Sequence, residues 1–153
     1  MRPDKDTYYL DIALAVSKRS TCLRRHYGCV IIKDDIIIAT GYNGSPRGEI
    51  NCCDTGECKR ADAKRYSSYE SCSSVHAEQN ALLATSRDKL IGATAYLACE
   101  ERTIAGDFES LKLKHGDWSE DYMPVPCPLC MRMLKNAGVT RIVNREGDVN
   151  VCD

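Results

Sequence analysis

The chain has 153 residues, with 21 Lys and Arg against 22 Asp and Glu, and a formal net charge of −1. This length predicts a single domain over residues 1–153, and the near-zero charge argues against binding of polynucleotides or membrane surfaces. No stretch approaches the roughly 20 apolar residues of a membrane span, and the charged opening MRPDKDTYYL lacks the apolar core of an export signal. We therefore expect a cytoplasmic protein with neither a membrane nor a nucleic-acid partner.

The first third of the chain predicts one helix followed by a β-hairpin. Apolar residues recur at helical spacing over 5–19. Runs of β-branched residues then predict strands over 29–33 and 36–41. The dipeptide Asp34-Asp35 between them suggests a tight hairpin turn.

The rest of the chain alternates helices and strands. Residues 75–87 and 128–138 are rich in helix formers, and Gly138 stops the second helix. Strands are expected over 93–99, 140–144 and 148–152. The alternation predicts an α/β fold, a three-layer α/β/α sandwich around a five-stranded mixed sheet, with binding sites at strand ends and helix starts.

His76 and Glu78 lie two residues apart in the segment SSVHAEQNAL. Residues two apart in an established helix point about 200° away from each other, so this pair shares a site only at the first turn or its cap. The pair therefore indicates the start of a helix.

Cys127 and Cys130 lie three residues apart in VPCPLC, where Pro128 suits the first position of a helix. With His76 they form a set of one imidazole and two thiolates, as in catalytic zinc sites that leave a fourth position for water. Either half alone is a weak signal, but H-x-E followed by P-C-x-x-C is the signature of zinc nucleobase deaminases. The alternative, a purely structural zinc site, leaves Glu78 as a buried charge without a task.

This chemistry assigns Glu78 the role of general acid and base. We expect its carboxylate to take a proton from the attacking water, deliver it to N3 of a cytosine ring and carry a second proton to the departing amine. The two helix N-termini favour the negative charges that gather at such a site.

Five segments of the chain resemble the deoxycytidylate (dCMP) deaminases of the cytidine deaminase superfamily. In order between about residues 8 and 143 they are RSTCLRR, GYNGSPRG, NCCD, HAEQNAL and PCPLC. The resemblance implies hydrolysis of dCMP to dUMP and ammonia for thymidylate synthesis, and a homo-oligomer, either a hexamer or a dimer. In regulated members it also implies dCTP or dTTP as effectors.

The same resemblance implies that Asn43 contacts the deoxyribose and that the Ala77 backbone lies near the base. A 5′-phosphate needs cationic or amide donors. The basic candidates are Arg24, Arg25, His26 and Arg87. The alternative for each of them is ordinary solvated surface or a subunit contact.

The ten cysteines leave several outside the catalytic set, which suggests a second metal. We expect a structural zinc, because similar family members place one here. The expected ligands are Cys22, Cys52, Cys58 and Cys72. Cys53 competes for one position, and the alternative is a set of independent buried thiols.

A long insertion, 101–124, separates the third strand from P-C-x-x-C and departs from the family pattern. It carries Phe108, Trp118 and Tyr122 and could act as a lid or as a subunit contact. Together with the replacement of a tyrosine that relatives commonly carry after the fourth strand, it leaves other substrates open: dCTP, CMP or a nucleoside. A non-catalytic zinc-binding module is the alternative from another class.

Overall fold

A five-stranded sheet forms the middle of the molecule in the computed structural model, which describes residues 1–61, 63, 66–100 and 124–149. The strand order is β2-β1-β3-β4-β5. β3 and β4 pair in parallel and the other neighbours pair antiparallel, so the sheet is mixed, as predicted. The strands are β1 (His26–Lys33), β2 (Ile36–Tyr42), β3 (Thr94–Glu100), β4 (Arg141–Asn144) and β5 (Gly147–Val149).

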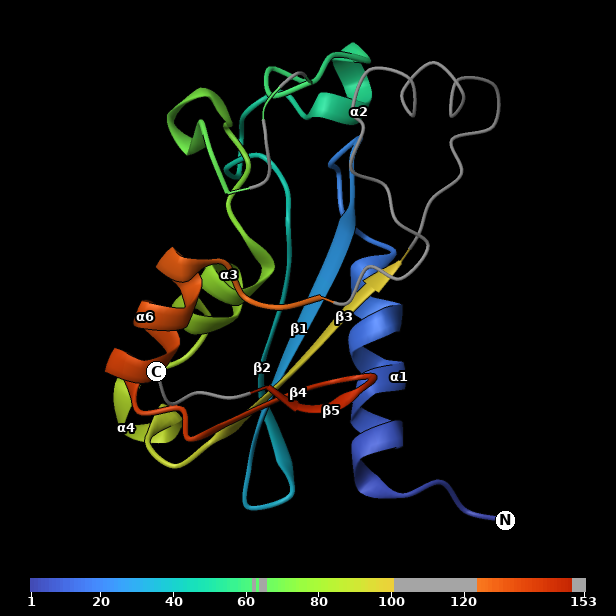
Figure 1. Cartoon of the computed structure of the whole chain (residues 1–153), viewed down its shortest axis with the longest axis vertical. Helices are drawn as coiled ribbons and strands as arrows, with labels where there is room; N and C mark the ends of the chain where they lie inside the picture. Colours follow the sequence, from blue (N-terminus) through green and yellow to red (C-terminus); the bar gives the residue numbers. More distant parts are fainter. Residues whose placement is uncertain (62, 64–65, 101–123, 150–153) are drawn as a thin grey trace.

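Helices cover both faces of this sheet, which confirms the predicted three layers. Helix α1 lies on one face, and α3 with α6 lies on the other (Figure 1). The described helices are α1 (Lys5–Ser17), α2 (Cys52–Thr55), the 3₁₀ turn η1 (Tyr69–Ser71), α3 (Ala77–Leu83), α4 (Arg87–Leu90) and α6 (Pro128–Ala137).

The alternation of side chains along β1 explains why two cores exist. Cys29 and Ile31 pack into the cluster shared with α3 and α6, whereas Val30 and Ile32 pack into the cluster shared with α1. Successive residues of a strand point to opposite faces, so one continuous apolar run serves both layers.

The hairpin between β1 and β2 forms at the predicted dipeptide. Asp34 has φ 50° and Asp35 has φ 63°. Two consecutive residues at positive φ are the requirement of a type I′ turn, and aspartate tolerates that conformation better than most residues.

Two boundaries differ from the sequence prediction. Strand β1 begins at His26, three residues early. The helix expected over 75–87 ends at Leu83, because Ser86 takes an extended conformation and caps a separate short helix, α4. Arg87 therefore starts α4 instead of ending the helix that follows His76.

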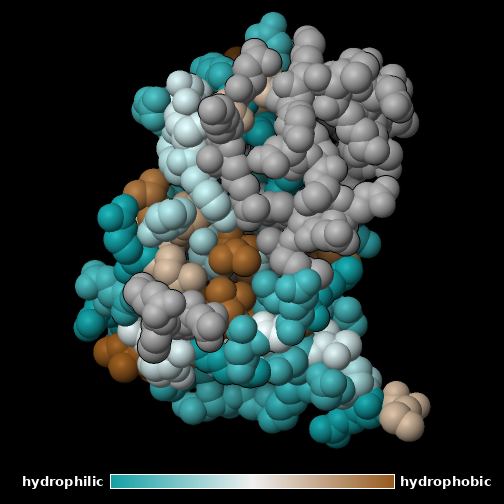
Figure 2. All heavy atoms as spheres, in the orientation of Figure 1, coloured by the Kyte–Doolittle hydropathy of each residue, from teal (hydrophilic) through white to brown (hydrophobic). Residues whose placement is uncertain are grey.

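Residues 101–123 and 150–153 lie outside the described part of the chain, and with them lie nearly all of the insertion that could act as a lid or as a subunit contact and the end of the last expected strand. On the face shown in Figure 2, the described surface is mainly hydrophilic, with hydrophobic side chains grouped near its middle. Within the described residues, no helix has the length and apolar character that crossing a membrane requires.

Candidate active site

His76 is the residue at which α3 begins. Its backbone is extended, with φ −72° and ψ 156°, and its backbone N–H donates to Gln79 Oε1 at 2.9 Å. The preceding residue, Val75, pairs with Gly44 through two backbone hydrogen bonds. The helix start is therefore anchored to the loop that follows β2, and the imidazole takes the cap position that the two-residue spacing to Glu78 predicts.

Cys127 occupies the corresponding position at α6. Pro128 is the first helical residue, and the backbone N–H of Cys130 donates to the Cys127 sulfur at 3.4 Å. Asn144, at the end of β4, donates from Nδ2 to the carbonyl of Pro124 at 3.2 Å and holds the approach to the helix. The starts of α3 and α6 are thus brought together from segments about fifty residues apart.

These two helix starts place three metal-binding atoms around one point. Nδ1 of His76 lies 3.6 Å from the sulfur of Cys127 and 3.4 Å from the sulfur of Cys130. In a tetrahedral zinc site with ordinary Zn–N and Zn–S bonds, the nitrogen and sulfur ligand atoms lie about 3.5 Å apart. Within the described part of the chain, this trio alone meets metal-ligand spacing. The donor set therefore fits zinc in both chemistry and size.

A hydrogen bond between the two cysteines shifts their pKa values in opposite directions. It is the largest of the causes that lower the pKa of the Cys127 thiol, and it is also the largest of those that raise the pKa of Cys130. Both sulfurs also lie at the positive end of α6, which favours thiolate. Metal binding needs both cysteines as thiolates and the imidazole neutral.

Glu78 lies beside the trio at the floor of the site. Its side chain is buried, with 6% exposed, and its carboxyl is within hydrogen-bonding contact of Cys130. Burial is the main cause that raises the pKa of Glu78. A carboxyl next to a metal position is placed to pass protons between a water molecule and a bound substrate.

A cavity opens above Glu78 and contains most of the predicted substrate residues. Asn43, Ala77, Arg24 and Arg25 all line it, together with His76 and Cys127. These residues come from the connection between α1 and β1, from the loop after β2 and from the starts of α3 and α6. The structure thus gathers segments that lie far apart in the sequence.

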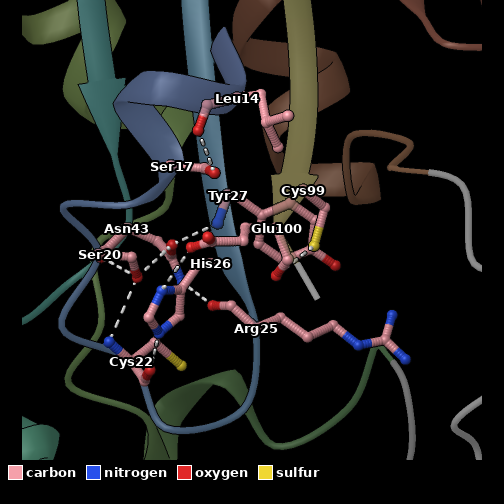
Figure 3. A network of polar contacts seen from close by, with 10 residues as sticks. All are labelled: Leu14, Ser17, Ser20, Cys22, Arg25, His26, Tyr27, Asn43, Cys99 and Glu100. Atoms are coloured by element: carbon pink, nitrogen blue, oxygen red, sulfur yellow. Dashed lines mark hydrogen bonds and ion pairs between the residues drawn. The ribbon is translucent and has the colours of Figure 1, made fainter. Parts of the chain in front are cut away.

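His26 and Arg87 are not among the described residues that line the cavity, and their contact with the phosphate stays a prediction. His26 is buried at the start of β1, where Nε2 donates to the carbonyl of Cys22 at 2.7 Å and Nδ1 lies 3.7 Å from Glu100 Oε2 (Figure 3). Arg87 donates from Nε to the carbonyl of Asn136 at 3.4 Å, so it ties α4 to α6. Both residues therefore have structural contacts away from the predicted phosphate.

Asn43 is at the centre of the network in Figure 3. Its Oδ1 accepts from Ser20 Oγ at 2.7 Å and from the backbone N–H of Tyr27 at 2.8 Å, and its Nδ2 donates to the carbonyl of Arg25 at 2.9 Å. A side-chain amide has two N–H donors, and the bond to Arg25 uses one of them. Asn43 thus joins the residues that follow α1 to β1. The second N–H of its amide could donate a hydrogen bond to a sugar hydroxyl.

Four more cysteines gather along the cavity. Cys22, Cys52, Cys58 and Cys72 all line it, whereas Cys53 does not and is exposed. The first two are close enough to Cys58 and Cys72 for those thiols to raise their pKa values, although burial is the larger cause. Their sulfurs do not reach the spacing of the His76 trio. The second zinc site stays a prediction.

Sequence reasoning missed a further part of the lining. Lys59, Arg60 and Tyr66 belong to the connection between α2 and η1, Tyr69 begins η1, and Tyr27 is on β1. The only local signal was the basic pair after Cys58 and the two tyrosines of YSSYE, since this connection has no helical or strand periodicity.

The comparisons with known proteins agree with this geometry. Residues 3–145 match the family model of the cytidine and deoxycytidylate deaminase zinc-binding region. The chain belongs to the cytidine and deoxycytidylate deaminase family. It is 36% identical over 143 residues, 92% of its length, to the deoxycytidylate deaminase of Saccharomyces cerevisiae. It is 35% identical to that of Mycobacterium phage D29, over 93% of this chain and 94% of the relative.

A solved structure of this family shares the fold. The dCMP deaminase of cyanophage S-TIM5, solved in complex with dCMP and dUMP, superposes with a TM-score of 0.63 at 26% identity, covering 94% of this chain and 82% of that one. The chain spans 45% of the S. cerevisiae enzyme and 31% of the deoxycytidylate deaminase of Schizosaccharomyces pombe, so it is shorter than some members of the deaminase family.

Proposed function

We propose that this protein hydrolyses dCMP to dUMP and ammonia. The observation that carries the proposal is the convergence of His76, Cys127 and Cys130 on one point beside the buried Glu78, at the floor of a cavity that cationic side chains line. The deoxycytidylate deaminases that the chain resembles support dCMP as the substrate.

The protein's own groups then have distinct tasks. His76, Cys127 and Cys130 would hold the zinc, which when bound supplies the Lewis acidity that lets water lose a proton near neutral pH. Glu78 takes that proton and delivers it to N3 of the cytosine ring as the water oxygen bonds to C4. It then carries the second proton from this oxygen to the amine, which leaves C4 as ammonia. Ala77, at the first position of α3, has a backbone N–H with no partner inside the helix, and we assign it to the base.

The experiment that tests this reaction follows ammonia release from dCMP, dCTP, CMP, deoxycytidine and cytidine. We expect dCMP to be preferred, and Glu78→Gln to lower kcat by roughly 10²- to 10⁴-fold with zinc content unchanged. Glu146→Gln, on the exposed turn between β4 and β5, is the matched control and should keep the wild-type rate. An equal rate in Glu78→Gln would contradict the mechanism, and preference for a nucleoside would contradict the substrate. If neither variant nor wild type deaminates any substrate while zinc still binds, the alternative of a zinc-binding module is favoured.

We assign the 5′-phosphate to the cationic side of the cavity. Arg24, Arg25, Lys59 and Arg60 line it, and among the lining residues that the structure describes Glu78 is the one carboxylate. A charge-assisted hydrogen bond contributes about 1.5–3 kcal/mol, so Arg25→Gln should raise KM for dCMP by roughly 10- to 100-fold and leave KM for deoxycytidine unchanged. Arg87→Gln, outside the cavity, should raise neither value.

A structural zinc on Cys22, Cys52, Cys58 and Cys72 is a second part of the proposal. Their common position along one cavity supports it, and the exposure of Cys53 favours Cys52 as the ligand. Freshly purified, reduced protein should contain two zinc ions per chain, and Cys58→Ser should contain one. One zinc in the wild type would contradict the second site.

Three further assignments rest on the family. We propose a homo-oligomer, a hexamer or dimer, with dCTP or dTTP as effectors, in a reducing compartment such as the cytoplasm, where zinc thiolates persist. Sedimentation of the zinc-loaded protein tests the assembly, and dCMP saturation curves with each triphosphate test the regulation.

A further inference from the structure

Tyr69 contacts two of the three proposed zinc ligands. Its ring centroid lies 5.5 Å from that of His76, at an interplanar angle of 58°. Its hydroxyl is hydrogen-bonded to the sulfur of Cys127. Tyr69 begins η1 and lines the cavity together with both of these ligands. It therefore contacts the metal position through the ligands while it supplies no ligand atom itself.

Arg60 holds the ring of Tyr69 from another side. The guanidinium carbon lies 4.8 Å from the ring centroid, within the range of a cation–π interaction. The backbone carbonyl of Arg60 accepts a hydrogen bond from Arg24 Nη1 at 3.1 Å. The chain between α2 and η1 is in this way attached to the segment before β1, and the ring has support on both sides.

The hydroxyl of Tyr69 has a definite electrostatic task at Cys127. A phenol is protonated at neutral pH, so it donates to the sulfur. Cys127 also receives the backbone N–H of Cys130 at 3.4 Å. Two thiolates would balance the charge of a bound divalent zinc ion. Each hydrogen bond to a thiolate withdraws electron density from the sulfur, so a bound metal ion would be a stronger Lewis acid.

We propose that Tyr69 is a positioning residue of the metal centre: its hydroxyl orients and partly neutralises the Cys127 thiolate, and Arg60 keeps its ring in place against His76. This role of Tyr69 adds to the proposed function. It rests on one part of that function, the binding of a metal ion by the His76 trio, and does not require deamination. It gives the segment after α2 a part in the chemistry as well as in the cavity wall.

The test removes the hydroxyl and retains the ring. We expect Tyr69→Phe to bind Zn²⁺ roughly 10- to 100-fold more weakly in a chelator competition, the range found for partners of metal ligands. In the Co²⁺-substituted protein the thiolate-to-cobalt charge-transfer band should shift, because one sulfur has lost a hydrogen bond. Tyr8→Phe, on the exposed side of α1, is the matched control and should change neither value.

A second pair of variants tests the support from Arg60. Arg60→Gln removes the cation and should shift the cobalt band in the same direction as Tyr69→Phe, whereas Arg60→Lys retains the cation and should restore most of the wild-type spectrum. Circular dichroism checks that each variant is folded, and the Arg60 pair decides the matter should Tyr69→Phe fail to fold.

Wild-type zinc affinity and an unchanged cobalt spectrum in Tyr69→Phe would overturn the proposal. Zinc affinity and the cobalt spectrum are both measured without a nucleotide. A negative result for Tyr69 can therefore be told apart from a negative result for the proposed deamination. Should wild type release no ammonia from dCMP while Tyr69→Phe still weakens metal binding, the deaminase assignment falls and the role of Tyr69 stands.

Discussion

Asn43 shows how one buried side chain serves both the fold and the cavity. Its amide bonds to Ser20, Tyr27 and Arg25, and it also lines the cavity that the proposed substrate enters. A role in binding deoxyribose and a role in holding β1 are therefore compatible, because each uses a different hydrogen of the same amide.

Replacing Asn43 separates these roles. Asn43→Ala leaves the N–H of Tyr27 and the carbonyl of Arg25 without their partner, so we expect the free energy of unfolding to fall by roughly 2–4 kcal/mol. Ser20→Ala removes the hydroxyl that donates to Asn43 and accepts from the backbone N–H of Cys22, touches no substrate position, and should cost about 1–2 kcal/mol. Urea unfolding measures both. Equal losses in the two variants would show that Asn43 does not hold the network.

At the scale of elements, two glycines permit the close packing of helices on the sheet. A Cβ on Gly28 would lie 2.0 Å from the carbonyl oxygen of Ala13 in α1, and one on Gly41 would lie 2.3 Å from that of Ala77 in α3. Both obstacles are backbone atoms, which cannot move without moving a helix. The two glycines thus set the distance of each helix layer from the sheet.

Gly41→Ala should therefore disturb the metal centre as well as the fold. Moving α3 displaces His76 and Glu78 together, so we expect zinc affinity to fall and stability to drop by about 1–3 kcal/mol, as for other overpacked cores. Thr40→Ala, at the neighbouring exposed position of β2, is the control. Chelator competition and urea unfolding measure the two effects, and wild-type zinc affinity in Gly41→Ala would show that α3 can adjust.

An ion pair joins the first helix to the last strands. Arg141 donates from Nη1 and Nη2 to Asp6 at 3.0 and 2.8 Å, and from Nε to Asp148 at 2.7 Å, while Tyr96 donates its hydroxyl to Asp6 at 2.7 Å. The hydrogen bond from Arg141 is the largest of the causes that lower the pKa of Asp6 below its ordinary value of 3.8.

The sign of this shift predicts a pH dependence of stability. A carboxyl with a lowered folded-state pKa stabilises the fold above its unfolded value and loses that contribution as the pH falls through the lowered value. The side chains are 41% and 39% exposed, so we expect Asp6→Asn to cost only about 1 kcal/mol at neutral pH. The gap to wild type should close below pH 3.8, whereas the control Asp11→Asn should show no such gap. A gap that persists in acid would contradict the ion pair.

At the scale of the whole molecule, the proposed zinc connects two distant parts of the chain. His76 opens α3, while Cys127 and Cys130 belong to α6, and these helices pack in the same core cluster. A ligand that binds the folded state stabilises it by RT ln(1 + [L]/Kd), about 4 kcal/mol at a free concentration 1,000 times Kd.

Zinc should therefore raise the melting temperature by roughly 8–16 °C, since each kcal/mol contributes about 2–4 °C in a chain of this size. Calorimetry of metal-free protein with and without added Zn²⁺ measures the rise. His76→Ala removes one of three ligands and should show a smaller rise. An equal rise in the two proteins would place the stabilising metal elsewhere.

The sequence by itself determined the five strands and the three longer helices and pointed to the proposed metal-binding trio, because each follows from a local pattern. Strand alternation, the proline that opens α6 and the spacing of His76 from Glu78 act within a few residues. Such local patterns do not depend on residues that are distant in the sequence. The same reasoning predicted the hairpin turn at Asp34 and Asp35.

Only the tertiary structure decided which basic and aromatic residues face the cavity. His26 follows Arg24 and Arg25 directly and looked like a third phosphate donor, yet it begins β1, where its side chain is buried against Cys22 and Glu100.

Arg60 and Tyr69 show the opposite case. They lie in a connection without periodicity, where neighbours in space are set by the elements at its two ends and not by spacing along the chain. The contact of Arg60 with Arg24 and that of Tyr69 with Cys127 cross long stretches of sequence. Short sequence motifs therefore indicate the proposed metal ligands. The residues that orient and polarise these ligands come into contact with them only when the helices pack on the sheet.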